Sequence, residues 1–199
     1  MKGIDELIKK ALNLREKGLN TAEIAEDLNV SLETATWLLT RPKLSDETKP
    51  RDIYINWSNI GKSSVRMRLV TDMLADLAIE SVDIHEIDVV LGIAINGIPL
   101  GALVADALGK KFGIIHPKQQ IIEDNESRSF LSSNFSDVDG KRCIVVDDII
   151  TTGRTAKETL NHLKSIGADV LLMAVIIDKR GISSIDGTPI KSLIHVETI

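Results

Sequence analysis

The sequence predicts a mixed α/β protein in which a small all-helical domain precedes a largely parallel sheet flanked by helices. From residue 61 onward, short apolar runs alternate with helical patterns, which is typical of a parallel sheet covered on both faces. Residues 1–42 instead show only helical periodicity, and the first proline of the chain closes them. A chain of 199 residues can bury roughly 70% of its surface, enough for one full domain and a small second one.

Composition and charge exclude several classes of protein. A hydrophobic fraction of 43% argues against a disordered chain, and no apolar run reaches the roughly 18 residues of a membrane-spanning helix. The charged start MKGIDELIKK differs from a signal peptide, so we expect a cytoplasmic protein with no membrane partner. One cysteine, Cys143, excludes an internal disulfide, and the four histidines lack metal-ligand spacing, so no metal site is assigned. The net charge of −5 argues against non-specific nucleic-acid binding by the whole chain.

Residues 1–42 are predicted to contain three helices. Apolar residues at spacings of three and four predict a first helix that stops near Gly18. Asn20 followed by Glu23 is a capping-box pattern and opens a short second helix. Ser31 is predicted to cap a third helix, so the last two helices form a helix-turn-helix.

The stretch 21–39 resembles the DNA-binding helix-turn-helix, which would place the third helix in the major groove. The residues that this helix would offer to DNA are Ser31, Glu33, Thr34, Thr36, Trp37 and Arg41. Six cations stand against seven acids in the domain, and this charge favours the plainer alternative of a three-helix cap or dimerisation module. A dimer that places two copies on adjacent half-sites would compensate for weak binding by one copy.

Residues 43–52 are predicted to be a linker, because they are mostly charged or hydroxyl residues with almost nothing to bury. The predicted α/β domain then covers residues 53–199. For Tyr54 and Trp57 we expect simple packing of the linker onto that domain.

The elements of the α/β domain follow from its periodicity. A first helix is expected to bury one face, made of Val65, Leu69, Met73, Leu74 and Leu77. The expected strands are 88–94, 112–116, 142–148 and 170–177, and the later helices are 98–108 and 154–166. Ligands of such sheets bind at the carboxyl ends of the strands.

The run 143–155 carries the most informative pattern: a buried strand ends in two acids, and a hydroxyl-rich turn then opens a helix. Backbone amides at the start of a helix attract phosphate, and Gly153 permits the backbone to approach it closely. The two acids can accept hydrogen bonds from sugar hydroxyls or hold Mg²⁺ through water. The predicted phosphoribosyl-binding residues are Asp147, Asp148, Thr151, Thr152, Gly153, Arg154 and Thr155. The alternative is an ordinary junction whose acids cap the helix, but adjacent acids on a buried strand end are costly without a ligand.

This run is similar to the phosphoribosyl pyrophosphate (PRPP) signature of the type I phosphoribosyltransferases. The segment 88–101 resembles the strand and pyrophosphate loop of orotate phosphoribosyltransferases, and 176–181 resembles their later strand beside the base. The resemblance implies that the pyrophosphate loop is Ala94, Ile95, Asn96 and Gly97, which would act through backbone amides. It also implies a type I phosphoribosyltransferase-like sheet with no tightly bound cofactor, to which Mg²⁺ would come with PRPP.

Two departures from these enzymes concern catalysis. Asn96 stands where the orotate enzymes carry a lysine, and it supplies no charge. Between Lys118 and Arg128, where the enzymes carry a basic closing loop, the chain has three acids and no other cation. Departing pyrophosphate builds negative charge that a closing cation would stabilise. We therefore assign no catalytic residue and do not expect an enzyme.

A helix-turn-helix joined to such a domain resembles the archaeal transcriptional regulators of sugar metabolism. The resemblance implies a homodimer or higher oligomer that binds promoter DNA and senses PRPP or a related sugar phosphate. Two alternatives stay open: an active phosphoribosyltransferase of orotate or purine type that uses PRPP and Mg²⁺, and a phosphosugar-binding protein with neither activity.

Overall fold

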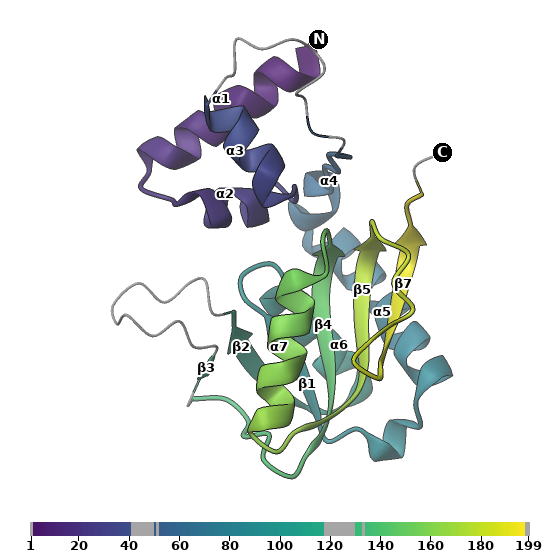
Figure 1. Ribbon diagram of the computed structural model, residues 1–199. Coiled ribbons are helices and arrows are strands. Elements are labelled where there is room, and N and C mark those ends of the chain that lie inside the picture. The colour runs from purple at the N-terminus through teal and green to yellow at the C-terminus, as the bar shows by residue number, and fades with distance from the viewer. Residues whose placement is uncertain (1, 41–49, 51, 118–129, 133, 198–199) are drawn as a thin grey trace. The chain divides into compact units, whose positions relative to one another are not determined.

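The computed structural model describes residues 2–40, 50, 52–117, 130–132 and 134–197 (Figure 1). The chain divides into two compact units, residues 1–56 and 57–199. The predicted linker, residues 43–52, lies mostly outside the described residues, so its boundaries stay predictions.

The first unit is all-helical, and local sequence signals define its helices. These are α1 (Lys2–Glu16), α2 (Thr21–Asp27) and α3 (Leu32–Thr40). The predicted capping box is confirmed: Asn20 Oδ1 accepts the backbone N–H of Glu23 at 3.0 Å, and the Glu23 carboxylate accepts that of Asn20 at 2.7 Å. Asn29 turns the chain between α2 and α3 with a φ of 54°. A small apolar core lies between the helices and consists of Ala11, Ile24, Ala25, Leu28, Val30, Ala35 and Leu38.

Tyr54 corrects one expectation. It packs against the core of the helical unit instead of the α/β domain, and Lys10 Nζ donates a hydrogen bond to its hydroxyl at 3.1 Å. The same ammonium lies 5.5 Å from the centre of the Tyr54 ring. The segment just after the predicted linker therefore belongs to the first unit.

The second unit is built on one sheet with the strand order β3-β2-β1-β4-β5-β7-β6. The strands are β1 (Val89–Ile93), β2 (Lys111–His116), β3 (Phe130–Leu131), β4 (Arg142–Ile150), β5 (Asp169–Asp178), β6 (Ser184–Ile185) and β7 (Thr188–His195). The five longer strands pair in parallel, and the two short edge strands, β3 and β6, pair antiparallel. The predicted mixed α/β architecture with a largely parallel sheet is confirmed.

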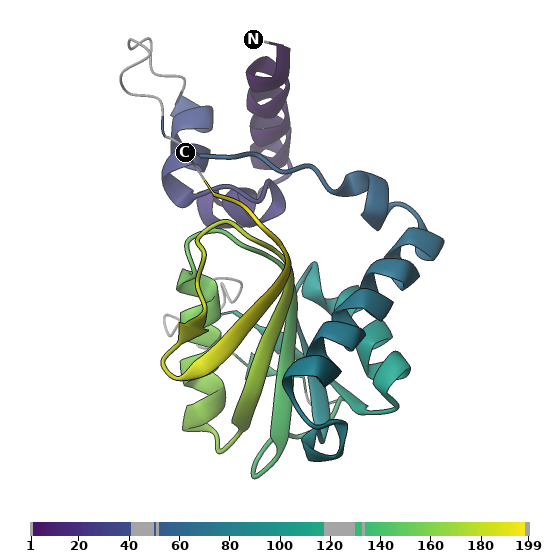
Figure 2. The ribbon, with the colours of Figure 1, turned by 90° about the vertical axis from the view of Figure 1, so that its right-hand side faces the viewer.

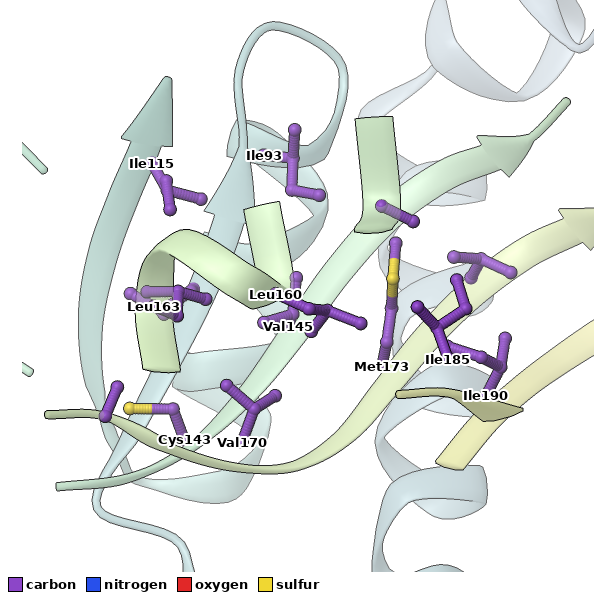
Figure 3. Packing of buried hydrophobic residues seen from close by; sticks show 14 of the residues in the cluster. Ile93, Ile115, Cys143, Val145, Leu160, Leu163, Val170, Met173, Ile185 and Ile190 are labelled. Carbon is purple, nitrogen blue, oxygen red and sulfur yellow. The ribbon is translucent and has the colours of Figure 1, made fainter. Parts of the chain in front are cut away.

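Helices cover both faces of this sheet, as Figure 2 shows. They are α4 (Ser58–Gly61), α5 (Ser64–Ser81), the 3₁₀ turn η2 (Ile84–Glu86), α6 (Gly97–Leu108) and α7 (Arg154–Ser165). Helices α5 and α6 lie on one face and α7 lies on the other. Leu160 and Leu163 of α7 pack onto Val145 and Val170 of the central strands (Figure 3), and all four are buried. None of the described helices combines the length and apolar character that a membrane span requires.

The expected face of α5 is wrong at three of its five residues, whereas Leu74 is buried and Leu77 half-buried as expected. Val65, Leu69 and Met73 are exposed, whereas the buried residues include Met67, Val70, Leu74, Ala75 and Ala78. The helix has two apolar sides, and the side with small alanines is the one that packs. Periodicity alone could not choose between them, because both sides repeat at helical spacing.

Candidate functional site

The centre of the sheet contains the point where the strand order reverses. From β1 the chain proceeds to β2 on one side, whereas from β4 it proceeds to β5 on the other side. Strands β1 and β4 are parallel neighbours, with Gly92 paired to Val146. In open α/β sheets, ligands bind outside the carboxyl ends of the strands at such a switch point. The predicted pyrophosphate loop follows β1 and the predicted phosphate turn follows β4, so topology brings them to one edge.

The acid pair lies within β4, which continues two residues beyond it to Ile150. The Asp148 side chain is buried and its carboxylate accepts a hydrogen bond from Asn96 Nδ2 at 3.0 Å. Asp147 is half-buried, and its Oδ1 accepts the backbone N–H of Asp148 at 2.9 Å. Burial raises the pKa of Asp148, and hydrogen bonds with the side chains of Asp147, Asn96 and Trp57 oppose that rise. This carboxylate is therefore costly to ionise until a cation or a further donor reaches it.

Three glycines allow the start of α6 to pack closely against β1 and β4. A Cβ on Gly97 would lie 2.6 Å from the carbonyl oxygen of Val146 and 3.2 Å from Asp147 Oδ1. A Cβ on Gly92 would lie 2.5 Å from the carbonyl oxygen of Gly97, and one on Gly101 would lie 2.9 Å from Gly92 Cα. Only glycine allows these backbones to approach so closely. The contact brings Asn96 to the acid pair, 52 positions away in sequence.

The predicted pyrophosphate loop is a short turn anchored at its first residue. The backbone N–H of Ala94 donates to the carbonyl of Ile115 on β2 at 2.9 Å, and the Ala94–Ile95 peptide bond is cis. The Ile95 side chain is 71% exposed, so this loop presents an apolar side chain to solvent. Asn96 is half-buried and turns toward Asp148.

The turn after β4 opens the twelve-residue helix α7. Gly153 is its N-cap with a φ of 78°, and no side chain caps the helix. A Cβ on Gly153 would lie 2.9 Å from Ile182 Cδ1, so both backbone conformation and space require glycine here. Thr151 and Thr155 are half-buried, whereas Thr152 is exposed. The amino end of α7, with its positive dipole, thus faces the edge that carries the acids.

Arg154 is exposed, and its Nε donates to Glu158 Oε1 at 2.9 Å. This one-turn pair holds the guanidinium along α7. The backbone N–H of Arg154 donates to Thr152 Oγ1 at 3.4 Å. The predicted site thus gains its polarity from backbone amides, hydroxyls and two acids, with Arg154 paired to its own helix.

Two side chains at the same edge, Trp57 and Asp178, were not assigned to the site from the sequence, although Asp178 lies in the segment 176–181. Trp57, expected to pack simply, also forms a side-chain hydrogen bond with Asp148. Asp178 ends β5, is 3% exposed, and accepts the backbone N–H groups of Arg180 and Ile182, each at 2.7 Å. His195 Nδ1 lies 3.7 Å from Asp178 Oδ2. The signal for Asp178 was present, since β5, like β4, is an apolar run that ends in an acid.

The candidate DNA-binding helix α3 begins with a network of hydroxyls. Ser31 Oγ accepts the backbone N–H of Thr34 at 3.1 Å, which confirms the predicted cap. The Asp52 carboxylate accepts the backbone N–H of Ser31 at 2.7 Å and the hydroxyl of Thr34 at 3.0 Å. Ser31 and Thr34, which were predicted to contact DNA, therefore already form hydrogen bonds within the helical unit.

The other predicted contacts on α3 differ in exposure. Glu33 and Thr36 are exposed. Trp37, expected on the outer side, packs against the core of the helical unit and stays half-buried. Arg41 lies outside the described residues, as do Lys118 and Arg128 of the predicted closing loop.

Cys143 and the acid pair differ in the chemistry that their surroundings allow. Burial raises the pKa of Cys143 to about 12, so its thiol stays protonated at neutral pH. Among the described residues, no three histidine, cysteine or acidic side chains gather as metal ligands. A magnesium ion that arrives with a diphosphate needs only one or two carboxylates, which Asp147 and Asp148 can supply.

Known proteins resemble the second unit alone and also the nearly complete chain. Residues 56–192 match the family model described as the phosphoribosyl transferase domain. The chain is 43% identical to the transcriptional regulator GfcR of Methanocella arvoryzae over 203 residues, which cover 98% of each chain. Among solved structures, orotate phosphoribosyltransferase from Aeropyrum pernix is similar with a TM-score of 0.59 and 22% identity, over 77% of this chain and 84% of that one. The orotate phosphoribosyltransferase of Mycobacterium tuberculosis in complex with PRPP is similar with a TM-score of 0.57 and 19% identity, over 72% and 81%.

Proposed function

Because this chain belongs to the family of the archaeal GfcR transcriptional regulators and carries a phosphoribosyl transferase domain, we propose that it is a promoter-binding regulator of sugar metabolism whose second unit senses PRPP or a related sugar phosphate. The observation that carries the proposal is the buried Asp148, held by Asn96 beside the switch point. Burial makes this carboxyl costly to ionise, and a bound ligand with its cation would offset that cost.

Each part of the site has a role in binding a phosphorylated sugar. The 5′-phosphate would accept the amide N–H groups at the amino end of α7, next to Thr151 and Thr155. The ribose hydroxyls would donate to Asp147 and Asp148. The amides of residues 94–97 would hold a diphosphate on the sugar, and Mg²⁺ bound with it would supply the charge that balances the two acids.

The same residues argue against transfer chemistry. Asn96 is neutral and its amide is already bonded to Asp148, so it supplies no cation to departing pyrophosphate. Binding without turnover is what a sensor requires, since a consumed effector would not report its own concentration.

DNA recognition is assigned to α2 and α3 of the first unit. Glu33 and Thr36 are the exposed predicted contacts among the described residues of α3. The acids of this unit outnumber its cations by one, so a single copy would make few favourable contacts with DNA phosphates. Two copies on adjacent half-sites, as in a homodimer, would bind more tightly. An effector then regulates binding if it prefers one geometry of that dimer.

The decisive experiment measures the two functions on the full chain. Fluorescence anisotropy should show tighter binding to a duplex from the promoter of its own gene than to a scrambled duplex, with an affinity that changes when PRPP and Mg²⁺ are added. Thr36→Asp should weaken DNA binding by about tenfold or more, whereas Asn161→Asp, which adds the same charge on the exposed side of α7, should not. Equal affinity for both duplexes with and without PRPP would refute the proposal.

A second candidate is an active phosphoribosyltransferase, which the complete acid pair and turn favour. Incubation with PRPP, Mg²⁺ and orotate or a purine base would then release pyrophosphate. Sustained turnover that is lost in Asp147→Asn and Asp148→Asn would establish this candidate. Binding of PRPP without turnover would reject it.

A further inference from the structure

Helix α5 carries an apolar stripe on its outer side. Val65, Leu69 and Met73 are four residues apart, so they follow one another along the helix. Their exposed fractions are 67%, 58% and 51%. Single exposed apolar residues are normal, but a contiguous row over two turns is typical of an interaction surface.

The charged residues of α5 are divided by sign on either side of Leu69. Arg66 and Arg68 precede Leu69, whereas Asp72, Asp76 and Glu80 follow it, and all five are exposed. The helix dipole favours the reverse order, with acids at the start and cations at the end. The first turn of α5 has no acid and the last turn has no base. This division of charge therefore does not serve the isolated helix, apart from the exposed pair of Arg68 Nε with Asp72 Oδ1 at 3.1 Å.

We infer that the occupant of this stripe is a second copy of the chain, bound through an antiparallel pair of α5 helices with Leu69 near the twofold axis. Residues equally far from Leu69 then lie level with each other. Val65 lies level with the partner's Met73, and Arg66 lies level with the partner's Asp72. The basic segment before Leu69 in each copy then lies against the acidic segment after Leu69 in the other, and the two helix dipoles run in opposite directions. A parallel pair would instead set Arg66 against the partner's Arg66.

This inference goes beyond the proposed function, since the stripe shares no residue with the phosphosugar site and its test needs neither DNA nor PRPP. It specifies which surface forms the homodimer and in which direction the two copies run.

The first test compares two substitutions on the same helix. Sedimentation equilibrium of the wild-type full chain should show a dimer, and Leu69→Glu should weaken dimerisation at least tenfold. Ile79→Glu is the matched control, because Ile79 is 46% exposed on α5 but lies off the stripe. Circular dichroism melts would verify that both variants fold. A monomeric wild type, or a Leu69→Glu variant that dimerises like the wild type, would overturn the inference.

The second test addresses direction and does not depend on Leu69→Glu folding. Leu69→Cys should form a disulfide-linked dimer on mild oxidation, whereas Ile79→Cys should not, and the native Cys143 is buried. Arg66→Asp and Asp72→Arg should each weaken dimerisation, and the double variant should restore it. A dimer that resists cross-linking through Leu69→Cys, or a double variant no better than the singles, would overturn the antiparallel arrangement.

Discussion

The two ends of the β1–β4 pair hold a carboxylate in different environments. At the amino end, Asp88 accepts the backbone N–H of Arg142 at 2.9 Å, and Arg142 Nε lies 3.7 Å from the same carboxylate. These contacts lower the pKa of Asp88, the backbone hydrogen bond most of all. At the carboxyl end, burial raises the pKa of Asp148, whose bonded side chains are those of Asp147, Asn96 and Trp57. One acid is balanced by a cation of the chain, whereas the other is surrounded by neutral donors and a second acid.

This difference separates a stabilising acid from a ligand-binding one. Asp88 needs nothing from outside, because its charge is satisfied when the strands pair. Asp148 is costly to ionise, and it lies at the edge where parallel sheets bind ligands. Substitutions at the carboxyl end should therefore change ligand binding, whereas substitution of Asp88 at the amino end should change only stability. Four substitutions test this comparison.

The largest effect is expected for Asp148→Asn. Loss of charged hydrogen bonds to the sugar should weaken PRPP binding by about 100-fold, measured by isothermal titration calorimetry with Mg²⁺. The free variant should be more stable than the wild type at neutral pH, because the folded pKa of Asp148 is raised. That gain should grow as the pH rises from about 4 and vanish below it, since both side chains are then neutral. A variant that binds PRPP normally would remove Asp148 from the site.

Gly97→Ala should damage both binding and folding. The new methyl group meets the Val146 carbonyl at 2.6 Å, so α6 must move away from the acids. We expect a loss of roughly 1–3 kcal/mol in the free energy of unfolding together with weaker PRPP binding. Gly109→Ala, at the other end of α6, is the control: its φ of 62° makes alanine strained, but nothing lies within 4 Å. If Gly109→Ala weakens PRPP binding as much as Gly97→Ala does, the close contact at Gly97 does not shape the site.

Asn96→Ala should have a smaller effect. It removes the donor to Asp148, so the pKa of that carboxyl rises further and PRPP affinity falls about tenfold. The pH at which binding reaches half its maximum should also move upward, as titration calorimetry across pH would measure. Asn161→Ala, on the exposed side of α7, should leave the profile unchanged. An unshifted profile in Asn96→Ala would mean that this amide does not control Asp148.

The smallest effect is expected for Asp88→Asn. Its lowered pKa contributes stability that is present above the unfolded value near 4 and is lost as the pH falls through the folded pKa. The variant should melt slightly below the wild type at pH 7 and equally at acidic pH, with PRPP binding intact. Thermal melts across pH would test this. Lost PRPP binding would break the contrast between the two ends.

Local signals predicted much of the fold and part of the site. The capping box at Asn20 and the cap at Ser31 depend on residues within one turn of each other, so their geometry follows from sequence. The phosphate turn and the acid pair were predicted from local patterns of the same kind, and their role in binding stays a prediction. Trp57 was missed as a partner of Asp148 because no local pattern joins positions so far apart.

The alternation of strands and helices, the capped helix ends and the glycines at sharp turns could be predicted from residue order, because they depend on short-range sterics and hydrogen bonds. The sequence did not show which side of α5 is buried, which unit Tyr54 joins, or that Asp148 has no cation among its partners in the described part of the chain. The physical reason is that burial and charge balance depend on neighbours that strand order brings together, as when Asn96 reaches Asp148 across 52 positions.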